Sequence, residues 1–461
     1  MAASSGVERL PPLDAIIAWR YSSFLFLFRT TQPVSALVGR FQHGLDRLCE
    51  QLPWLSGNLH STGDTSLGLK LRWNTNERRP AVVDRGSIPL AYEALATDGF
   101  PPSSIPDHVW PTLLAFDSLP PGAGLPVLEL TVFGFGDNQG VGLCFCKHHS
   151  VMDAPGVDQL LRIWAKCISD VPTISKDPTP AFSPRVWMPD ALSTEINATS
   201  ALHLNALLTL HPEFYTTDPV PQLTTLPVAA TKMIHLPLSR LNSLKSRVAK
   251  HMQVRHTTNT LLTAVLWSAI TRARLQHTPS LATSPTLLLT VANGRRHLPV
   301  SAPPYFGNLL SFCGAELPIS AVTATGGGES SFDAALAAVC DAVAASTARS
   351  RASWRPWAEM HSLVDKVGGY CRLRLRHDPF TGRGFLVTSW ANLGMYGVDF
   401  GAGLGRPEAV RVRATGADGL CFVMPRRRSE AGEEVLEVLL GLTSETFDAL
   451  EEDKMWRWLV G

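Results

Sequence analysis

The stretch between Val141 and Trp164 constrains the fold of this chain more than any other segment. Residues 141–146 form a short apolar run bounded by glycine and charge, which predicts a buried strand. Residues 157–164 place apolar side chains at helical spacing, which predicts a helix. Asp153 stands just before an Ala-Pro pair, and proline is tolerated in the first turn of a helix, so Asp153 is the expected N-cap. The chain therefore turns from strand to helix within a few residues.

Two histidines, His148 and His149, lie on this turn. A histidine titrates near neutral pH, so a positioned imidazole can accept a proton from a hydroxyl and return it later. Neighbouring strand residues point to opposite faces, so the two rings are not expected to share a role. From residue types alone a purely structural alternative stays open, in which both histidines end a strand and Asp153 only caps a helix. A metal site is a further alternative, but no partner cluster with metal spacing occurs in the sequence, and we expect none.

Composition limits the class of protein. The length of 461 residues suggests two or three domains, and 45% hydrophobic with 18% charged residues is typical of a compact protein with a sizeable core. The formal net charge of +1 favours neither a nucleic-acid nor a membrane partner. Eight cysteines without a CxxC pair suit a reducing compartment better than a disulfide framework. With no signal-peptide pattern at the start, we expect a cytoplasmic location.

The remaining periodicity indicates a chain of alternating strands and helices. From about residue 172 to 227 prolines are frequent and the periodicity fades, so we expect a long crossover with one helix near Ser200 to Leu210. A final helix is expected over 444–459. The other expected strands cover residues 24–28, 67–73, 127–133, 287–291, 385–388, 420–424 and 434–440, and the other expected helices cover residues 34–52, 258–274 and 332–345.

Several motifs resemble those of a known family. His149-x-x-x-Asp153 resembles the HxxxD signature of the BAHD acyltransferases, and Asp399-Phe400-Gly401-Ala402-Gly403 resembles that family's DFGWG signature. The similarity covers nearly the whole chain. Within the family, the sequence resembles the fungal branch that includes the trichothecene acetyltransferases. Further landmarks follow in the family's order: Asn293-Gly294-Arg295, Tyr305-Phe306-Gly307-Asn308 and Thr388-Ser389-Trp390.

Two positions depart from the family pattern. The family's tryptophan in DFGWG is Ala402 here, and the glycine that often follows the aspartate is Ala154. Gly156, two residues further on, is expected to supply the missing backbone freedom.

The resemblance implies an α+β fold that is a two-domain α/β sandwich. Each domain is expected to resemble chloramphenicol acetyltransferase, with a mixed sheet flanked by helices and the active site at the domain interface. We expect an N-terminal domain over residues 1–175 that carries HxxxD, a crossover over 176–228, and a C-terminal domain over 229–461 that carries DFGxG. Some exchange of segments between the two sheets is also expected.

The resemblance also implies an activity, that of an acyl-CoA-dependent O-acyltransferase. We expect an O-acetyltransferase that acts on a hydroxyl of a secondary metabolite by direct transfer in a ternary complex. No bound cofactor and no metal are expected. Acyl-CoA is expected to be a co-substrate, and acetyl-CoA is the expected form. The expected partners are acyl-CoA and a small-molecule alcohol, and the chain is expected to be a monomer.

Each matching position implies a role. His149 would be the general base, and Asp153 would turn from the pocket to pair with Arg295. Thr388 and Trp390 match positions that supply hydrogen-bond donors to the reaction oxyanion. Two further residues carry weaker expectations: Asn308 as a contact to coenzyme A, and Asp399 as a structural residue or a proton acceptor.

Other functions fit parts of the pattern. The His-His-x-x-x-Asp pattern also resembles condensation domains of peptide synthetases, which take acyl groups from carrier proteins, although the Asp399 motif argues against this. A non-catalytic small-molecule binder with the same fold is a third hypothesis. Asp399-Phe400-Gly401 also occurs in protein kinases, but the other kinase motifs are absent from the sequence.

Overall fold

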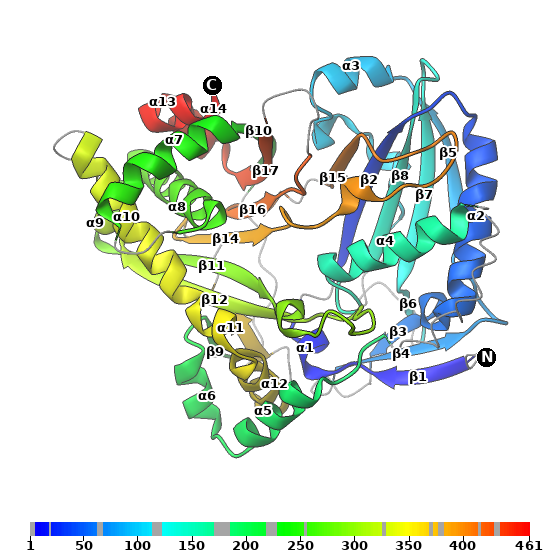
Figure 1. Cartoon of the computed structure of the whole chain (residues 1–461), viewed down its shortest axis with the longest axis horizontal. Helices are drawn as coiled ribbons and strands as arrows, with labels where there is room; N and C mark the ends of the chain where they lie inside the picture. Colours follow the sequence, from blue (N-terminus) through cyan, green and yellow to red (C-terminus); the bar gives the residue numbers. More distant parts are fainter. Residues whose placement is uncertain are drawn as a thin grey trace.

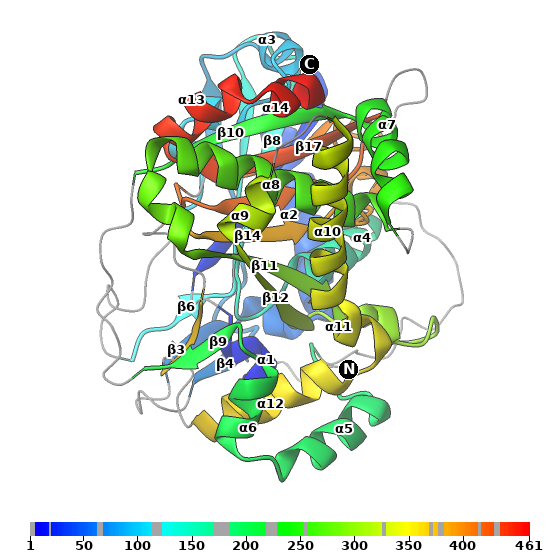
Figure 2. The same ribbon diagram turned by 90° about the vertical axis from the view of Figure 1, so that its left-hand side faces the viewer.

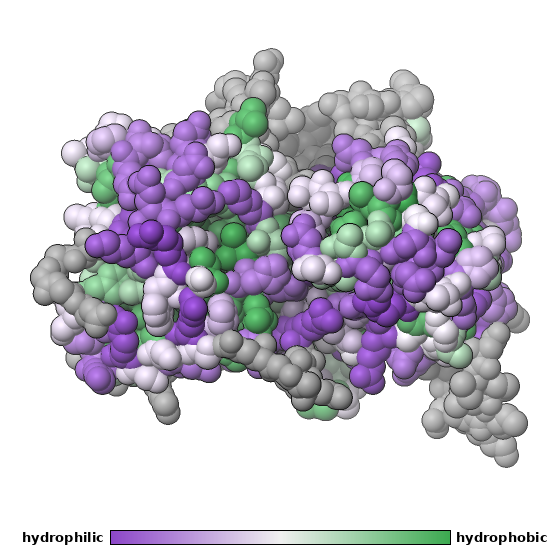
Figure 3. Space-filling model, turned by 90° about the horizontal axis from the view of Figure 1, so that it is seen from above, coloured by the Kyte–Doolittle hydropathy of each residue, from purple (hydrophilic) through white to green (hydrophobic). Residues whose placement is uncertain are grey.

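Two lobes, each built on a mixed sheet covered by helices, make up the protein (Figure 1). The computed structural model describes residues 5–17, 20–61, 68–112, 122–169, 185–217, 228–252, 256–324, 329–367, 372–376, 382–413, 416–427 and 434–461. The expected fold class, a two-domain α/β sandwich with mixed sheets, is confirmed. Seen from above, hydrophilic residues cover most of both lobes, and apolar surface shows between them (Figure 3).

The N-terminal lobe contains the strand that leads into the two histidines. Its five-stranded sheet has the order β15 (Ala409–Val412), β2 (Tyr21–Arg29), β8 (Gly140–His148), β7 (Leu128–Phe135) and β5 (Val82–Ile88). The described pairs are antiparallel except β5 with β7. All nine residues of β8 are buried, because β2 and β7 flank it in the sheet and a hydrophobic cluster covers each of its faces. β15 comes from the C-terminal part of the chain, so both parts of the sequence build this sheet.

Two helices cover one face of this sheet, α2 (Val34–Gln51) and α4 (Ala154–Ile168), and they pack against each other (Figure 1). Pro33 precedes α2 and Pro53 follows it, as helix punctuation predicts. Burying one large apolar side chain stabilises the fold by about 1.5–3 kcal/mol, so each apolar stripe fixes its helix firmly. The fully or nearly fully buried positions are Leu37, Phe41, Leu45 and Leu48 in α2 and Val157, Leu160, Leu161 and Trp164 in α4.

The C-terminal lobe is built on a six-stranded sheet. Its order is β10 (Ala230–Pro237), β17 (Val435–Leu442), β16 (Leu420–Val423), β14 (Gly384–Ser389), β11 (Pro285–Asn293) and β12 (Leu310–Pro318). β14 runs parallel to both of its neighbours, and the other described pairs are antiparallel. Helices α8 and α10 lie across its outer face (Figure 2). The helices of this lobe are α7 (Leu238–Val248), α8 (Thr258–His277), α9 (Ile319–Thr323), α10 (Glu329–Ser346), α13 (Ser444–Glu452) and α14 (Lys454–Val460).

Smaller elements complete the structure. A four-stranded sheet has the order β1 (Ser5–Arg9), β4 (Leu69–Asn74), β3 (Asn58–Ser61) and β6 (Leu125–Pro126), and β9 (Phe214–Thr216) pairs with β13 (Leu373–Leu375). The remaining helices are α1 (Pro12–Ala15), α3 (Tyr92–Thr97), α5 (Asp190–Ser200), α6 (Leu204–Leu210), α11 (Ala348–Ala352) and α12 (Arg355–Val367). A separate hydrophobic cluster joins α1, α5, α6 and α12. Within the described part of the chain, no helix is both long and apolar enough to cross a membrane.

The helix expected near Ser200 to Leu210 is present as α6, but the crossover contains a second helix, α5, that was not expected. α5 ends at Ser200 and α6 begins at Leu204, and β9 follows, so the described residues 185–217 of the crossover are well structured. The break occurs because Thr199 is buried and its hydroxyl donates to the carbonyl of Ala358 in α12 (3.1 Å), which fixes the end of α5. Because prolines are frequent in this region, α5 was not predicted from the sequence. Both α5 and α6 pack on α12.

The expected single helix over 444–459 is wrong, since it is divided into α13 and α14. Asp453 separates them: its carboxylate accepts a hydrogen bond from the Trp456 amide (2.8 Å) and so caps α14. The same carboxylate binds Arg272 of α8 (2.8 Å), which holds the break in place.

A buried histidine bridges two glutamates at the end of α6. The ring nitrogens of His211 lie 2.7 Å from Glu213 and 3.2 Å from Glu359, and Arg349 also binds Glu359. Burial lowers the pKa of His211, but the hydrogen bonds to the two carboxylates outweigh it, so the net pKa is raised. His211 is therefore protonated more readily in the folded protein than in the unfolded chain.

We expect this cluster to make stability depend on pH. Because the pKa of His211 is raised in the folded protein, protonation of this ring stabilises the folded state. The stabilisation is complete below the ordinary histidine pKa of about 6.5, and it is lost as the pH rises through the raised pKa. The difference in free energy of unfolding between the parent and His211→Gln should therefore be largest at mildly acidic pH and shrink toward alkaline pH. Urea denaturation across this range measures it, with exposed His108→Gln as the control. A difference that grows with pH would contradict the assignment.

Candidate active site

The turn between β8 and α4, residues 148–153, is called the histidine turn below. Asp153 caps α4: its Oδ1 accepts a hydrogen bond from the Gly156 amide at 2.8 Å. The side chain of Asp153 is fully buried. The turn is therefore anchored at its helical end by a carboxylate that lies inside the protein.

Arg295 binds Asp153 from the C-terminal part of the chain. Two guanidinium nitrogens donate to the two carboxylate oxygens, each at 2.8 Å, and the Leu309 amide donates to Oδ2 at 3.1 Å. Arg295 also donates to the carbonyls of Tyr305 and Gly307. The bidentate geometry is the strong form of this ion pair, and it joins the histidine turn to the second half of the chain.

The two histidines lie in different surroundings. His148 is fully buried, and its ring packs edge-on against Tyr21 with 5.2 Å between the ring centroids. His149 is partly exposed. Nδ1 of His149 is buried and makes no hydrogen bond to any residue that the structure describes. Of the two histidines, His149 is thus the one with solvent-accessible surface.

The main chain of His149 is held from both sides. Its amide donates to the carbonyl of Arg20 (2.8 Å), and its carbonyl accepts from Nδ2 of Asn308 (2.9 Å). Nδ2 of Asn308 also donates to the buried carboxylate of Asp14 (2.8 Å), which binds Arg185 (2.6 Å). These contacts fix the backbone of the turn without using the imidazole.

The surroundings of His149 favour the neutral imidazole. Protein atoms surround most of the ring, and this desolvation lowers the pKa of His149 well below its usual range. The charge of Lys147 lowers this pKa further, while the carbonyl of His149 itself acts in the opposite direction. The neutral ring carries the lone pair that a general base needs.

Gly156 is required for space and not for backbone freedom, contrary to expectation. It lies in the first turn of α4 and has no positive φ. A Cβ at this position would lie 2.3 Å from the carbonyl oxygen of Phe306. The glycine therefore lets α4 approach the segment that precedes Asn308 and Leu309, which contact the histidine turn.

Thr388 and Trp390 lie at the end of β14, on the side of the C-terminal lobe that meets the N-terminal sheet (Figure 1). Thr388 is partly exposed. The Trp390 ring stacks on Phe24 of β2 with 5.1 Å between centroids. Phe24 pairs with Phe145 of β8, four residues before His149. The structure thus places this pair at the junction of the lobes, against the strands that lead to the histidine turn.

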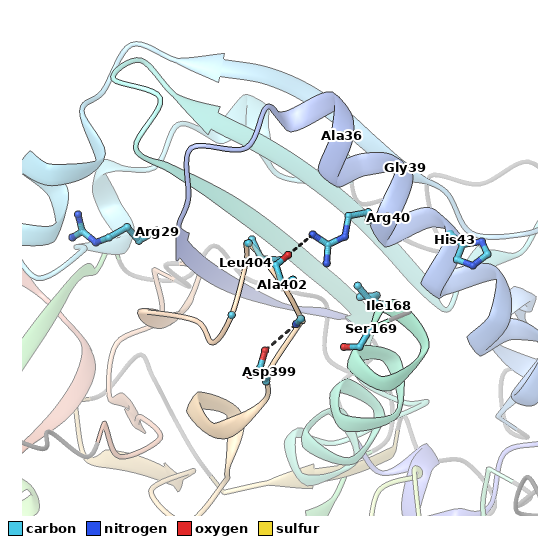
Figure 4. Close-up of a pocket in the computed structure, with 13 residues that line it drawn as sticks. Arg29, Ala36, Gly39, Arg40, His43, Ile168, Ser169, Asp399, Ala402 and Leu404 are labelled. Atoms are coloured by element: carbon cyan, nitrogen blue, oxygen red, sulfur yellow. Dashed lines mark hydrogen bonds between the residues drawn. The ribbon is translucent and has the colours of Figure 1, made fainter. Parts of the chain in front are cut away.

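Asp399 lies far from the histidine turn. Its loop lines an open pocket of about 1160 Å³ with the first half of α2 and the last residues of α4 (Figure 4). α4 has 15 residues and rises 1.5 Å per residue, so its two ends are roughly 22 Å apart. Asp399 is exposed and accepts a hydrogen bond from the Gly401 amide (2.9 Å), which closes a local turn.

The glycines of this loop take the positive φ values expected of a structural turn. Gly401, Gly403 and Gly405 have φ of 87°, 80° and 68°. Arg40 of α2 holds the loop by donating to the carbonyl of Ala402 at 2.9 Å (Figure 4). Ala402 is exposed, so its small side chain does not disturb the core.

The sequence interpretation missed three residues at the site. Lys147 is buried under the histidine turn, and Asp14 and Arg185 form a buried ion pair linked to Asn308. The signal for Lys147 was a lysine at the end of an apolar strand run. Asp14 and Arg185 lie 171 residues apart, so local pattern could not join them.

Among the described residues, no group of three or more His, Cys, Asp or Glu side chains could hold a metal ion.

Comparisons with known proteins identify the family and the fold. A family model described as the Transferase family matches residues 103–455, and a trichothecene 3-O-acetyltransferase-like N-terminal domain matches residues 21–167. A trichothecene 8-O-acetyltransferase from Fusarium sporotrichioides is 25% identical over 96% of this chain and 96% of its own length. The trichothecene 3-O-acetyltransferase TRI101 from the same organism is 24% identical over 98% of this chain and 94% of its own. The crystal structure of F. graminearum TRI101 complexed with coenzyme A and T-2 mycotoxin matches with a TM-score of 0.77 at 20% identity, over 99% of this chain and all of that chain.

Proposed function

The chain belongs to the BAHD acyltransferases, the Transferase family, and on that premise we propose that it transfers an acyl group from a coenzyme A thioester to a hydroxyl group. The observation that carries the proposal is the partly exposed, neutral ring of His149, held where the two lobes meet. Its backbone is bound by Arg20 on one side and Asn308 on the other. A base fixed in this way can serve two substrates that enter between the lobes.

His149 is the proposed general base. Because its Nδ1 is buried, Nε2 is the nitrogen assigned to face the substrate. Nε2 takes the proton of the acceptor hydroxyl as the oxygen attacks the thioester carbonyl. A carbon–oxygen bond forms, and the tetrahedral intermediate then breaks its carbon–sulfur bond. The imidazolium returns the proton to the leaving thiolate, so no covalent acyl-enzyme is required.

Asp153 and Arg295 are proposed to orient the base without touching the substrate. Both oxygens of Asp153 are occupied by Arg295 and by the amides of Gly156 and Leu309, so this carboxylate has no room to bind the imidazole. Its role is to fix the turn that aims His149.

Asn308 is proposed to act in the same way. The structure places its side chain fully inside the protein, where it binds Asp14 and the carbonyl of His149. This position favours a role in holding the turn over the expected contact with coenzyme A. We also assign Asp399 a structural role. It lies at the C-terminal end of α4, whereas the histidine turn lies at the N-terminal end of this helix.

Thr388 is proposed to donate a hydrogen bond to the oxyanion. It is partly exposed at the end of β14, and Trp390, two residues further on, stacks on Phe24 of the N-terminal sheet. Thr388→Val keeps the shape and removes the hydroxyl, so we expect kcat to fall by about 10²-fold, the usual loss for one oxyanion donor. Steady-state kinetics measure this, with exposed Ser389→Ala as the neighbouring control. A kcat unchanged in Thr388→Val would remove the hydroxyl from the mechanism.

The proposed co-substrate is acetyl-CoA, and the proposed acceptor is a hydroxylated secondary metabolite. Support comes from relatives named as acetyltransferases of trichothecenes and from a neighbour structure that contains coenzyme A. The test is thiol release from acetyl-, malonyl- and longer-chain CoA donors against a panel of hydroxylated natural products. Transfer from a free CoA thioester supports the proposal. Transfer only from an acyl group on a carrier protein, or acceptor binding without thiol release from any donor, would contradict it.

A further inference from the structure

Lys147 is a buried cation that the mechanism above does not use. It is 1% exposed and lies in β8, directly before the histidine turn. Its Nζ donates to the main-chain carbonyl of Met152, the residue before Asp153. This hydrogen bond joins the strand residue just before the turn to the fifth of its six residues, so it closes the turn around His149.

The ammonium of Lys147 belongs to a group of charges in which only Glu8 and Arg295 are partly exposed. The members are the carboxylates Glu8, Asp14 and Asp153 and the cations Lys147, Arg185 and Arg295. Arg295 pairs with one carboxylate and Arg185 is shared by the other two, so one negative charge remains for Lys147 to balance. A fourth cation, Arg20 on the segment before β2, acts on both Lys147 and His149 from outside this group.

Keeping a lysine here opposes folding. Burial lowers the pKa of Lys147 to about 7, because the surrounding protein solvates an ammonium poorly. The unfolded chain holds this proton more tightly, so the lysine contributes unfavourably to stability at neutral pH. An apolar side chain of similar size would pack in this position without that penalty. The charge therefore points to a role in the site.

We propose that Lys147 is a positioning residue for the transfer reaction, which closes the histidine turn through Met152 and holds the neighbouring His149 ring in its neutral form. The inference rests on the proposed function, because it takes His149 as the base. A positive charge two residues away disfavours a second positive charge on the imidazole, and in the poorly solvated interior this repulsion is strong. The groups that face the two side chains are Asp14, Asp153, Arg20 and His148.

Two substitutions separate the hydrogen bond from the charge. Lys147→Gln can still donate to the carbonyl of Met152 but carries no charge, and Lys147→Met removes both. Lys166→Gln is the matched control, because it removes an exposed lysine from α4. An NMR titration of ¹³C-labelled histidine rings follows His149 directly and needs no turnover. His149→Gln identifies its resonance.

We expect the pKa of His149 to rise by about one unit or more in both Lys147 variants, and the acid limb of kcat/KM to move upward by the same amount. Lys166→Gln should change neither. The inference is overturned if His149 has the same pKa in the parent and in Lys147→Gln. It is also overturned if His149 stays neutral in both proteins down to the pH at which they unfold. If Lys147→Met does not fold, Lys147→Gln still decides the question. A shifted titration in a protein that transfers no acyl group would instead contradict the proposed function and leave the link between the two side chains intact.

Discussion

His149→Ala is expected to lower kcat by ~10²–10⁴-fold and to leave the protein folded, because a positioned base typically contributes a factor of this size. Stability should change little for a structural reason. The contacts that hold His149 use its amide and its carbonyl, which alanine retains. Nδ1 of the ring has no hydrogen-bond partner among the described residues, so removal of the imidazole breaks no such bond. Steady-state kinetics and thermal denaturation of the same preparation measure both effects.

His148→Ala is the matched control and should behave in the opposite way. His148 is fully buried against Tyr21, so its removal should destabilise the protein by about 0.5–3 kcal/mol while kcat stays within several-fold of the parent. A folded but inactive His148→Ala, or a near-normal kcat in His149→Ala, would show that the base is wrongly assigned.

Asp153→Ala is expected to lower both stability and turnover. The carboxylate is fully buried, and it binds Arg295 twice and two backbone amides. Removing one partner of a buried ion pair typically destabilises by about 3–5 kcal/mol, because the other charge is left without compensation. The turn then no longer aims His149, so kcat should fall as well. Urea denaturation and kinetics measure the two losses.

Two comparisons separate the ion pair from simple helix capping. Thr257→Ala removes the N-cap of α8, where the hydroxyl accepts from the Thr260 amide, and should destabilise by about 1 kcal/mol. Arg295→Met should resemble Asp153→Ala, and the double variant should lose less than the sum of the two single losses. If Asp153→Ala loses no more stability than Thr257→Ala, Asp153 is only a cap.

The strand, the turn and the helix around the two histidines could be predicted from the sequence because their signals are local. A short apolar run predicted the strand before His148, helical spacing of apolar residues predicted the helix that begins at Ala154, and the Ala-Pro pair marked Asp153 as the cap. The partner of Asp153 lies 142 residues further along, and only the family resemblance pointed to Arg295. Residues that meet only through the fold leave no periodic signal.

Other features could not be read from the sequence for the same reason. Lys147 looked like the charged end of an apolar strand, because the carboxylates that accompany it come from Asp14 and Asp153 on other elements. β15 joins the N-terminal sheet by pairing with β2, although the two are far apart in the chain. The break between α5 and α6 depends on the contact of Thr199 with α12, which helical spacing alone does not reveal.

The measurement that tests the central claim most directly is the ratio of free thiol to acylated product formed from acetyl-CoA and a hydroxylated acceptor, in the parent and in His149→Ala. We predict one thiol per acetylated product in the parent, and no thiol release when the acceptor is omitted. His149→Ala should form both products at least about 10²-fold more slowly. Parent-like rates in His149→Ala, or thiol release that does not depend on the acceptor, would contradict the account.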